Sequence, residues 1–220
     1  MASDMKGDPE ILAALTPRNL VSAYCQGVFP MVEEGRLMWF RPDPRGLLPL
    51  DERFHVPRRL RRTIRSGRFA CTVDRCFDQV IACCANRPNG EPTWISPEMR
   101  IAYGRLHELE LAHSFEAWPA DRVGDGLPVG GLYGVAIGAA FFGESMFHTV
   151  TDAGKVALVA SVDHLRRRGF ALYDIQWTTD NLKRHGAYEV SARDYQFMLN
   201  AAVGAAPSAP LNASLHVPPP

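Results

Sequence analysis

The chain has 220 residues, of which 46% are hydrophobic and 22% charged, and this is long enough to bury one large or two small cores. Lys plus Arg and Asp plus Glu number 24 each, so the overall charge predicts no polyanionic partner and any nucleic-acid surface must be local. No apolar run approaches the roughly 20 residues of a membrane span, and the N-terminus has no basic start followed by an apolar stretch. We therefore expect a cytoplasmic protein that makes no membrane contact.

The cysteines number five, which is odd, and four of them fall close together in the sequence. They are Cys25, Cys71, Cys76, Cys83 and Cys84. This distribution favours reduced thiols over a disulfide framework. Zinc ligands normally come as two cysteines separated by two to four residues in each arm, so we expect packing roles here and no metal site.

Residues 1–50 are predicted to form a small N-terminal domain. Thr16 followed by Pro17 is a helix start, and Gly27 is a left-handed stop. A strand is expected at 37–40 and a second apolar run at 47–50, on either side of a stiff turn rich in proline.

Residues 51–205 are predicted to form a larger domain, in which the hydrophobic period changes from helix to strand and back. Its first part holds an arginine-rich helix at 57–66, a strand at 69–73, a helix capped by Asp74 and a helix opened by Ser96-Pro97. Its second part holds strands at 112–118, 131–137 and 139–147, a helix from Asp152 to Gly169, a strand at 170–176, a helix at 179–185, a strand at 188–190 and a helix at 191–201. Residues 206–220 are rich in proline and poor in large apolar residues, so they are predicted to be a disordered tail.

Seven short segments, in order along the chain, resemble the leucyl/phenylalanyl-tRNA–protein transferase family. They are YCQGVFP at 24–30, WFRPDPR at 39–45, TWI at 93–95, AHSFEAW at 112–118, GGLYG at 130–134, FGESMF at 142–147 and DIQ at 174–176. The resemblance implies an α+β fold, with a small N-terminal domain followed by an acetyltransferase-like mixed-sheet domain of the acyl-CoA N-acyltransferase type. We expect a monomer that needs no cofactor. The implied activity is transfer of leucine or phenylalanine from Leu-tRNA or Phe-tRNA to proteins with N-terminal Arg or Lys, which marks them for N-degron degradation.

Asp174 and Gln176 are the candidate catalytic residues. Two residues apart on a strand, they are expected to share one face, with Tyr173 and Ile175 on the other. A carboxylate and an amide are costly to bury in an apolar strand without partners. The alternative is an aspartate that caps the next helix beside a surface glutamine. The resemblance makes Asp174 the electron-relay or base residue, and Gln176 the group that positions the carbonyl.

Glu144 is a lone carboxylate that suits the ammonium of an aminoacyl group, and the resemblance assigns it to the α-amino group of the transferred amino acid. An exposed strand residue is the alternative. An apolar pocket for a leucine or phenylalanine side chain is predicted from Leu132, Phe141, Met146, Leu158 and Tyr173. Any folded domain would also bury most of these residues.

Trp39 and Trp94 lie beside loops, where an exposed indole can stack on an unpaired terminal adenine. Burial in the core is the ordinary role of either residue. The resemblance places Trp39 at the tRNA 3′ end.

Arg58, Arg61, Arg62 and Arg65 follow the spacing of one helical face. A solvated basic face is the alternative, but an arginine cluster in a neutral chain favours a patch that contacts tRNA phosphates.

Several positions depart from the family pattern. Gly154 replaces the serine that usually precedes Lys155, Glu110 stands where a glycine is usual, the loop at 121–128 is longer than usual, and Ile175 stands where a cysteine is common. Two other functions also remain open. An N-acyltransferase that uses acyl-CoA would need the pyrophosphate signature found at 166–171, although there it falls where a helix ends and a strand begins. A tRNA-binding module without catalysis would leave Glu144, Asp174 and Gln176 unexplained.

Overall fold

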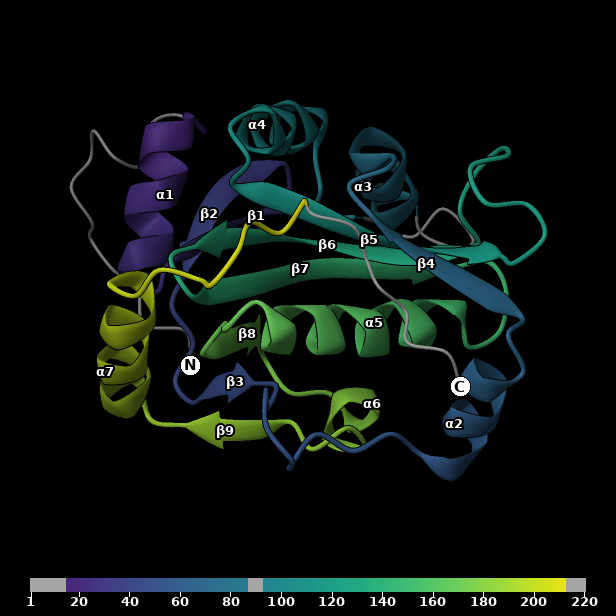
Figure 1. Ribbon diagram of the computed structural model, residues 1–220. Coiled ribbons are helices and arrows are strands. Elements are labelled where there is room, and N and C mark those ends of the chain that lie inside the picture. Colours follow the sequence, from purple (N-terminus) through teal and green to yellow (C-terminus); the bar gives the residue numbers. More distant parts are fainter. Residues whose placement is uncertain (1–14, 87–92, 213–220) are drawn as a thin grey trace.

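The computed structural model describes residues 15–86 and 93–212, which form a seven-stranded sheet, a separate two-stranded hairpin and seven helices (Figure 1). The helices are α1 (Pro17–Cys25), α2 (Arg58–Arg65), α3 (Phe77–Ala85), α4 (Pro97–Glu108), α5 (Ala153–Arg167), α6 (Asp180–Lys183) and α7 (Ala192–Val203). The strands are β1 (Phe29–Glu33), β2 (Arg36–Phe40), β3 (Arg45–Leu47), β4 (Phe69–Val73), β5 (Ala112–Pro119), β6 (Gly130–Ile137), β7 (Ala140–His148), β8 (Leu172–Gln176) and β9 (Tyr188–Val190).

The large sheet is mixed, as predicted, and has the strand order β4-β5-β6-β7-β8-β3-β9. Its pairs are antiparallel except for β7 and β8, which run parallel. A parallel pair needs a crossover connection, and α5 provides it. The helix begins after Asp152 and ends before Gly169, where the backbone turns with a φ of 76°.

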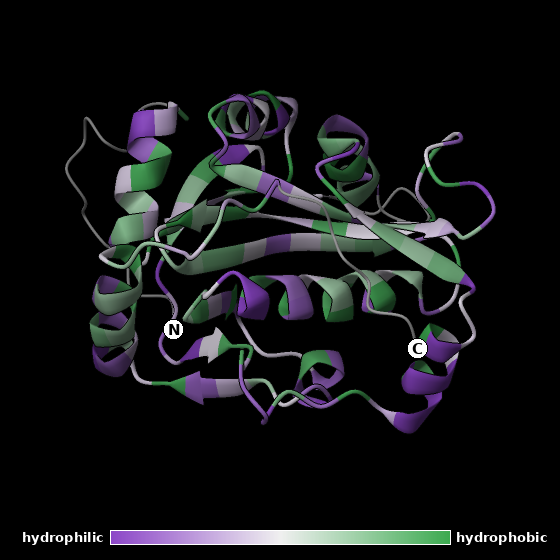
Figure 2. Cartoon of the chain, viewed as in Figure 1, coloured by the Kyte–Doolittle hydropathy of each residue, from purple (hydrophilic) through white to green (hydrophobic). Residues whose placement is uncertain are grey.

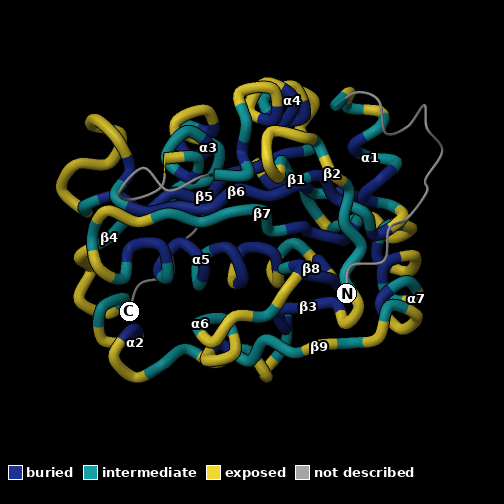
Figure 3. Tube along the Cα trace, turned by 180° about the vertical axis from the view of Figure 1, so that it is seen from behind, coloured by how far each residue is buried: buried dark blue, intermediate teal, exposed yellow. Residues whose placement is uncertain are grey.

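Helices cover both faces of the sheet. In Figure 1, α1, α3 and α4 lie on one side of the central strands and α5 on the other. Figure 2 shows the apolar residues concentrated on the strands and on the inner sides of these helices, whereas α2 is hydrophilic over most of its surface. In Figure 3, the centre of the sheet and much of α5 are buried. Two main hydrophobic cores result, one on each side of the sheet.

Two local expectations are corrected. The segment before Glu34, for which no strand was predicted, is strand β1 and pairs along its whole length with β2. Asp74 does not cap the following helix, because Cys76 occupies the N-cap position. The Asp74 carboxylate instead accepts hydrogen bonds from the Ser114 backbone N–H at 2.8 Å and contacts His113 Nδ1 at 2.7 Å, so it ties two strands together.

The N-terminal segment is not packed separately up to residue 50. Strand β3 is inserted in the large sheet between β8 and β9. Helix α1 also contributes Leu20 and Tyr24 to the same core as the larger unit. The hairpin and α1 therefore pack on the main sheet.

Part of the predicted disordered tail is ordered, and this corrects the expectation for residues 206–212. Leu211 is buried in the core beneath α5, and its carbonyl lies 2.9 Å from His164 Nε2. Asn212 donates a hydrogen bond of 2.9 Å to Glu110. The segment is thus held both by an apolar side chain in an existing core and by hydrogen bonds. Residues 213–220 lie outside the described residues.

Two of the departures from the family pattern, at Glu110 and Gly154, have structural explanations. Glu110 has a φ of 57°, a left-handed conformation that favours glycine, which is the usual residue there. Gly154 is buried at the start of α5, and a Cβ on it would lie 2.8 Å from the Phe147 carbonyl oxygen of β7. The glycine therefore allows α5 to approach β7 closely.

We predict that Gly154→Ser lowers the free energy of unfolding by about 1–3 kcal/mol, because the added atoms overpack the contact between α5 and β7. Urea denaturation followed by circular dichroism measures the change. Gly104→Ser in α4 is the matched control, since a Cβ there meets only Asp78 Oδ1 at 3.8 Å. Equal stability of the two variants would show that the approach of α5 to β7 is not limiting.

Candidate active site

The candidate site lies where the parallel strands β7 and β8 separate. Their register ends at the pair Phe142 and Asp174, although β7 continues to His148. Each strand then contains an extra residue relative to its antiparallel neighbour. Glu144 is the extra residue on β7, because Tyr133 pairs with Ser145 and Gly134 with Gly143. Such bulges bend a strand and re-aim side chains, and here they open the sheet.

A pocket of about 130 Å³ occupies this opening. It is lined from β6, β7, α5, β8 and α6 by Leu132, Tyr133, Gly143, Glu144, Ser145, Met146, Leu158, Tyr173, Ile175, Gln176 and Leu182. Four of the five predicted apolar residues are in this lining. The fifth, Phe141, is fully buried behind it, with its ring 5.0 Å from that of Tyr173.

Asp174 is held by a buried arginine, Arg45, to which the sequence pattern assigned no role. Arg45 Nε donates to Asp174 Oδ1 at 2.9 Å, and Arg45 Nη2 donates to Oδ2 at 2.6 Å. The Tyr195 hydroxyl and the Gln176 backbone N–H also donate to this carboxylate, at 2.5 and 2.8 Å. Burial by itself would lower the pKa of Arg45. The attraction and the hydrogen bonds of the adjacent Asp174 carboxylate act in the opposite direction, and the pKa lies above its usual value.

Strand alternation predicted that Asp174 and Gln176 point to the same face. This prediction is wrong, because the two side chains do not enter one cavity. Leu47 pairs with Asp174 and Gly46 with Gln176, so Ile175 is an extra residue that interrupts the alternation. Gln176, with a φ of 58°, lines the pocket together with Tyr173 and Ile175. Asp174 is fully buried and contacts Tyr195 instead. It supports Gln176 through the Gln176 backbone.

Glu144 lies in a network of tyrosine hydroxyls. Tyr103 donates to Glu144 Oε2 at 3.1 Å, and the Tyr24 and Tyr103 hydroxyl oxygens are 2.6 Å apart. Burial raises the pKa of Glu144 to about 7, while hydrogen bonds from Tyr24 and Tyr103 oppose that shift. Burial also raises the pKa of both tyrosines well above 10, so they remain neutral donors near neutral pH.

Three buried polar atoms around the pocket find no hydrogen-bond partner among the described residues. They are Glu144 Oε1, Gln176 Nε2 and the Tyr133 hydroxyl oxygen. Glu144 as a residue is only partly buried, but this oxygen is inaccessible to solvent. Buried polar groups are nearly always hydrogen-bonded, so an acceptor, an amide donor and a hydroxyl together indicate a place for a polar ligand.

The predicted tRNA contacts lie outside this pocket. Trp39 and Trp94 are both partly buried and pack against the core that includes α1. Trp94 also lines a surface hollow of about 790 Å³ beside the β1-β2 hairpin. Both tryptophans thus combine a core contact with partial exposure.

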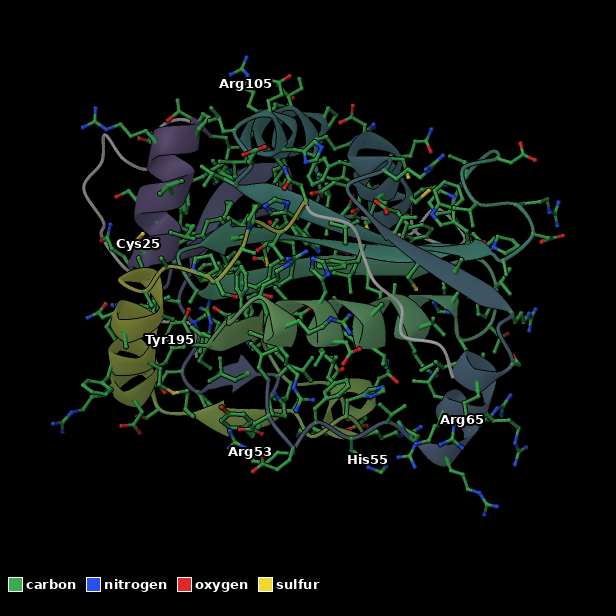
Figure 4. All side chains as sticks on the ribbon, viewed as in Figure 1. Cys25, Arg53, His55, Arg65, Arg105 and Tyr195 are labelled. Carbon is green, nitrogen blue, oxygen red and sulfur yellow. The ribbon has the colours of Figure 1, made fainter. Side chains whose placement is uncertain are left out.

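The predicted arginine patch is a real surface feature. Arg58, Arg61, Arg62 and Arg65 are all exposed on α2, while Leu60 anchors the helix. Thr63 donates a hydrogen bond of 3.2 Å to Asp152, the residue before α5. Figure 4 shows the nitrogen-tipped side chains of α2, including Arg65, projecting away from the body. The patch therefore flanks the start of α5, whose Leu158 lines the pocket.

Other possible sites receive no support from the described residues. All five cysteines fall in this part of the chain, and none forms a disulfide. No three His, Cys, Asp or Glu side chains in residues 15–86 and 93–212 gather as metal ligands. In the same ranges no helix combines the length and apolar character needed to cross a membrane.

Comparison with known proteins identifies the class of protein as aminoacyltransferase. Residues 47–200 match the family model described as leucyl/phenylalanyl-tRNA protein transferase, and residues 13–43 match the model of its N-terminal domain. The chain belongs to the leucyl/phenylalanyl-tRNA protein transferase family.

The sequence is similar to those of curated relatives over most of their length. A leucyl/phenylalanyl-tRNA–protein transferase of Akkermansia muciniphila is 49% identical over 191 residues, covering 86% of this chain and 96% of that protein. The protein of the same name from Herpetosiphon aurantiacus is 47% identical, with 84% and 93% covered. That from Rhodopseudomonas palustris is 47% identical, with 90% and 86% covered.

We predict that Glu144 makes stability depend on pH in a definite direction. Burial raises its pKa from the ordinary 4.5 of a glutamate to about 7 in the folded chain, so the folded state binds the proton more tightly. The contribution is fully favourable below pH 4.5 and falls as the pH rises to 7, by about 3 kcal/mol in total. Urea denaturation from pH 4 to 8 should show this loss in the parent and not in Glu144→Gln.

Glu108→Gln is the control for that measurement, because Glu108 is an exposed carboxylate on α4. Its pH dependence should follow that of the parent. A parallel decline in Glu144→Gln would mean that Glu144 titrates as an ordinary surface carboxylate.

Proposed function

We propose that the protein transfers leucine or phenylalanine from aminoacyl-tRNA to the N-terminal amine of proteins that begin with Arg or Lys. The observation that carries the proposal is the pocket between β7 and β8, which combines apolar walls with unpartnered atoms of Glu144 and Gln176. Membership of the family supports the same activity. Marking of the acceptor for degradation follows if the modified N-terminus is then recognised.

The donor amino acid fits this pocket through both its ends. Leu132, Met146 and Leu158 would contact its side chain, and an unbranched Met adapts to either leucine or phenylalanine. Glu144 Oε1 would accept a hydrogen bond from its α-ammonium, which would also favour the ionised form of Glu144. The donor thereby satisfies a buried acceptor that otherwise has no described partner.

Gln176 is placed to act on the ester. Its amide would donate to the carbonyl oxygen as negative charge develops there, an interaction that strengthens in the transition state. The acceptor amine attacks the ester carbon, a C–N bond forms, the bond to the tRNA ribose oxygen breaks, and the proton of the amine passes to that oxygen. Asp174 is fully enclosed by donors, so we propose that it acts by positioning Gln176.

The arrangement of strands supports an acyl-CoA N-acyltransferase architecture for the larger unit. A mixed sheet opens between two parallel neighbours, one of which follows a crossover helix. The donor itself is better explained as aminoacyl-tRNA than as acyl-CoA. Residues 166–171 mark the end of α5, so they present no helix N-terminus to a pyrophosphate.

We predict that Gln176→Ala lowers the single-turnover transfer rate by about 10²-fold, since it removes one donor to the developing oxyanion. Asp174→Asn should lower the rate as strongly through Gln176, and should also reduce stability by about 3–5 kcal/mol, because it leaves the Arg45 charge unpaired. Glu144→Gln should chiefly raise KM for charged tRNA, because Glu144 is proposed to bind the α-ammonium of the donor in the ground state as well as in the transition state.

Tyr195→Phe is the matched control, since it removes one hydrogen bond to Asp174 and leaves the ion pair intact. It should retain most of the rate. Folding is checked by circular dichroism for every variant. Transfer at the parental rate by Gln176→Ala would remove Gln176 from the mechanism.

We predict that alanine at Arg58, Arg61, Arg62 and Arg65 weakens tRNA binding about equally for all tRNA sequences. Each lost phosphate contact should reduce the slope of log affinity against log salt by about 1. Arg100→Ala with Arg105→Ala is the control, since both arginines are exposed on α4, on the opposite side of the molecule (Figure 1). An unchanged salt slope in the α2 variant would make that helix merely a solvated surface.

A further inference from the structure

An exposed tryptophan directly follows Gln176. The side chain of Trp177 is 46% exposed. Its ring meets those of Phe29 and Phe40 edge to face, with centroids 5.3 and 6.2 Å away. A large aromatic group left half in solvent beside a reactive site is well suited to a ligand. The donor pocket does not include it.

The position of Trp177 is imposed by a glycine on the neighbouring strand. Gly46 pairs with Gln176, and a Cβ on Gly46 would lie 2.8 Å from the Trp177 carbonyl carbon and 2.9 Å from the Thr178 nitrogen. The chain therefore leaves β8 at Gln176, with its left-handed φ, and passes directly over Gly46. Trp177 is fixed at this turn.

A carboxylate lies on the far side of the same glycine. Glu189 of β9 also pairs with Gly46, so Gln176, Gly46 and Glu189 form a row across three strands, about 10 Å long at the usual strand spacing. Glu189 is exposed, and the Thr178 hydroxyl donates to it. Among the described residues, no basic side chain is within ion-pair distance of Glu189. The nearby Arg53, labelled beside β9 in Figure 4, pairs with Asp51 at 2.7 Å.

We propose that Trp177 and Glu189 bind the cationic side chain of the first residue of the acceptor protein. This inference rests on the proposed function, because it places the attacking amine at Gln176. A long aliphatic stem with a charged end, as in Arg or Lys, can extend from that point along the row of residues. The indole attracts the cation through its ring, and Glu189 pairs with it.

A stacked adenine is the other ligand that an exposed indole accepts. The negative charge of Glu189 disfavours a nucleotide here, because its phosphates repel a carboxylate. Substitution of Trp177 distinguishes the two ligands. The KM of the acceptor changes if Trp177 binds the cationic residue, and the KM of the tRNA changes if it binds adenine.

The test compares two acceptor peptides that differ only in the first residue, arginine or its neutral isostere citrulline. The parent should show a kcat/KM about tenfold or more higher for the arginine peptide, as expected for a cation bound by an aromatic ring and a carboxylate. Glu189→Gln and Trp177→Leu should each reduce that ratio about fivefold, with KM for Leu-tRNA unchanged. Gln at 189 still accepts the Thr178 hydrogen bond, so loss of the turn does not explain the change. Glu108→Gln should leave the ratio at the parental value.

A persistent preference for arginine in both variants would overturn the assignment of Trp177 and Glu189 and leave the proposed function intact. A raised KM for Leu-tRNA with an unchanged ratio would also overturn it, in favour of adenine at Trp177. Failure of the parent to transfer leucine to either peptide would instead refute the proposed function.

Discussion

Arg45 is wholly buried, and its guanidinium holds the Asp174 carboxylate through two nitrogens. The same group donates to the Gly27 carbonyl at 3.0 Å and stacks over the rings of Phe29 and Tyr195. One cation thus connects the end of α1, the hairpin, β3, β8 and α7. Breaking a buried pair of this kind leaves an uncompensated charge, so the N-terminal segment and strand β8 are energetically coupled.

This ion pair determines what Asp174 can do. A carboxylate with donors on both oxygens and no exposure is a rigid support. It holds the backbone of Gln176 in a left-handed conformation at the point where β8 ends. The extra residues Glu144 and Ile175 then separate the strands, so the pocket depends on irregular pairing in the sheet.

Charge is distributed so that a neutral chain can contact unlike partners. The basic α2 lies beside the start of α5, the pocket holds a carboxyl whose pKa is about 7, and an exposed glutamate lies two strands from Gln176. We propose that these regions meet the tRNA backbone, the transferred amino acid and the cationic acceptor residue respectively. The equal totals of acidic and basic residues therefore do not show that basic and acidic side chains lie in separate regions of the molecule.

The sequence by itself determined the order of most elements, because caps, glycine stops and hydrophobic periods are local signals. The sequence also determined the family, through seven ordered segments, and the exposed face of α2. Of the five apolar residues predicted for the pocket, four line it. Tertiary structure decided the rest. The role of Arg45 depends on a contact with a residue 129 positions away, which no local pattern encodes. The separation of Asp174 from Gln176 depends on a bulge that only the pairing with β3 reveals. The burial of Leu211 depends on a core already formed by other elements, so residues 206–212, which look disordered by composition, have a defined place in the structure.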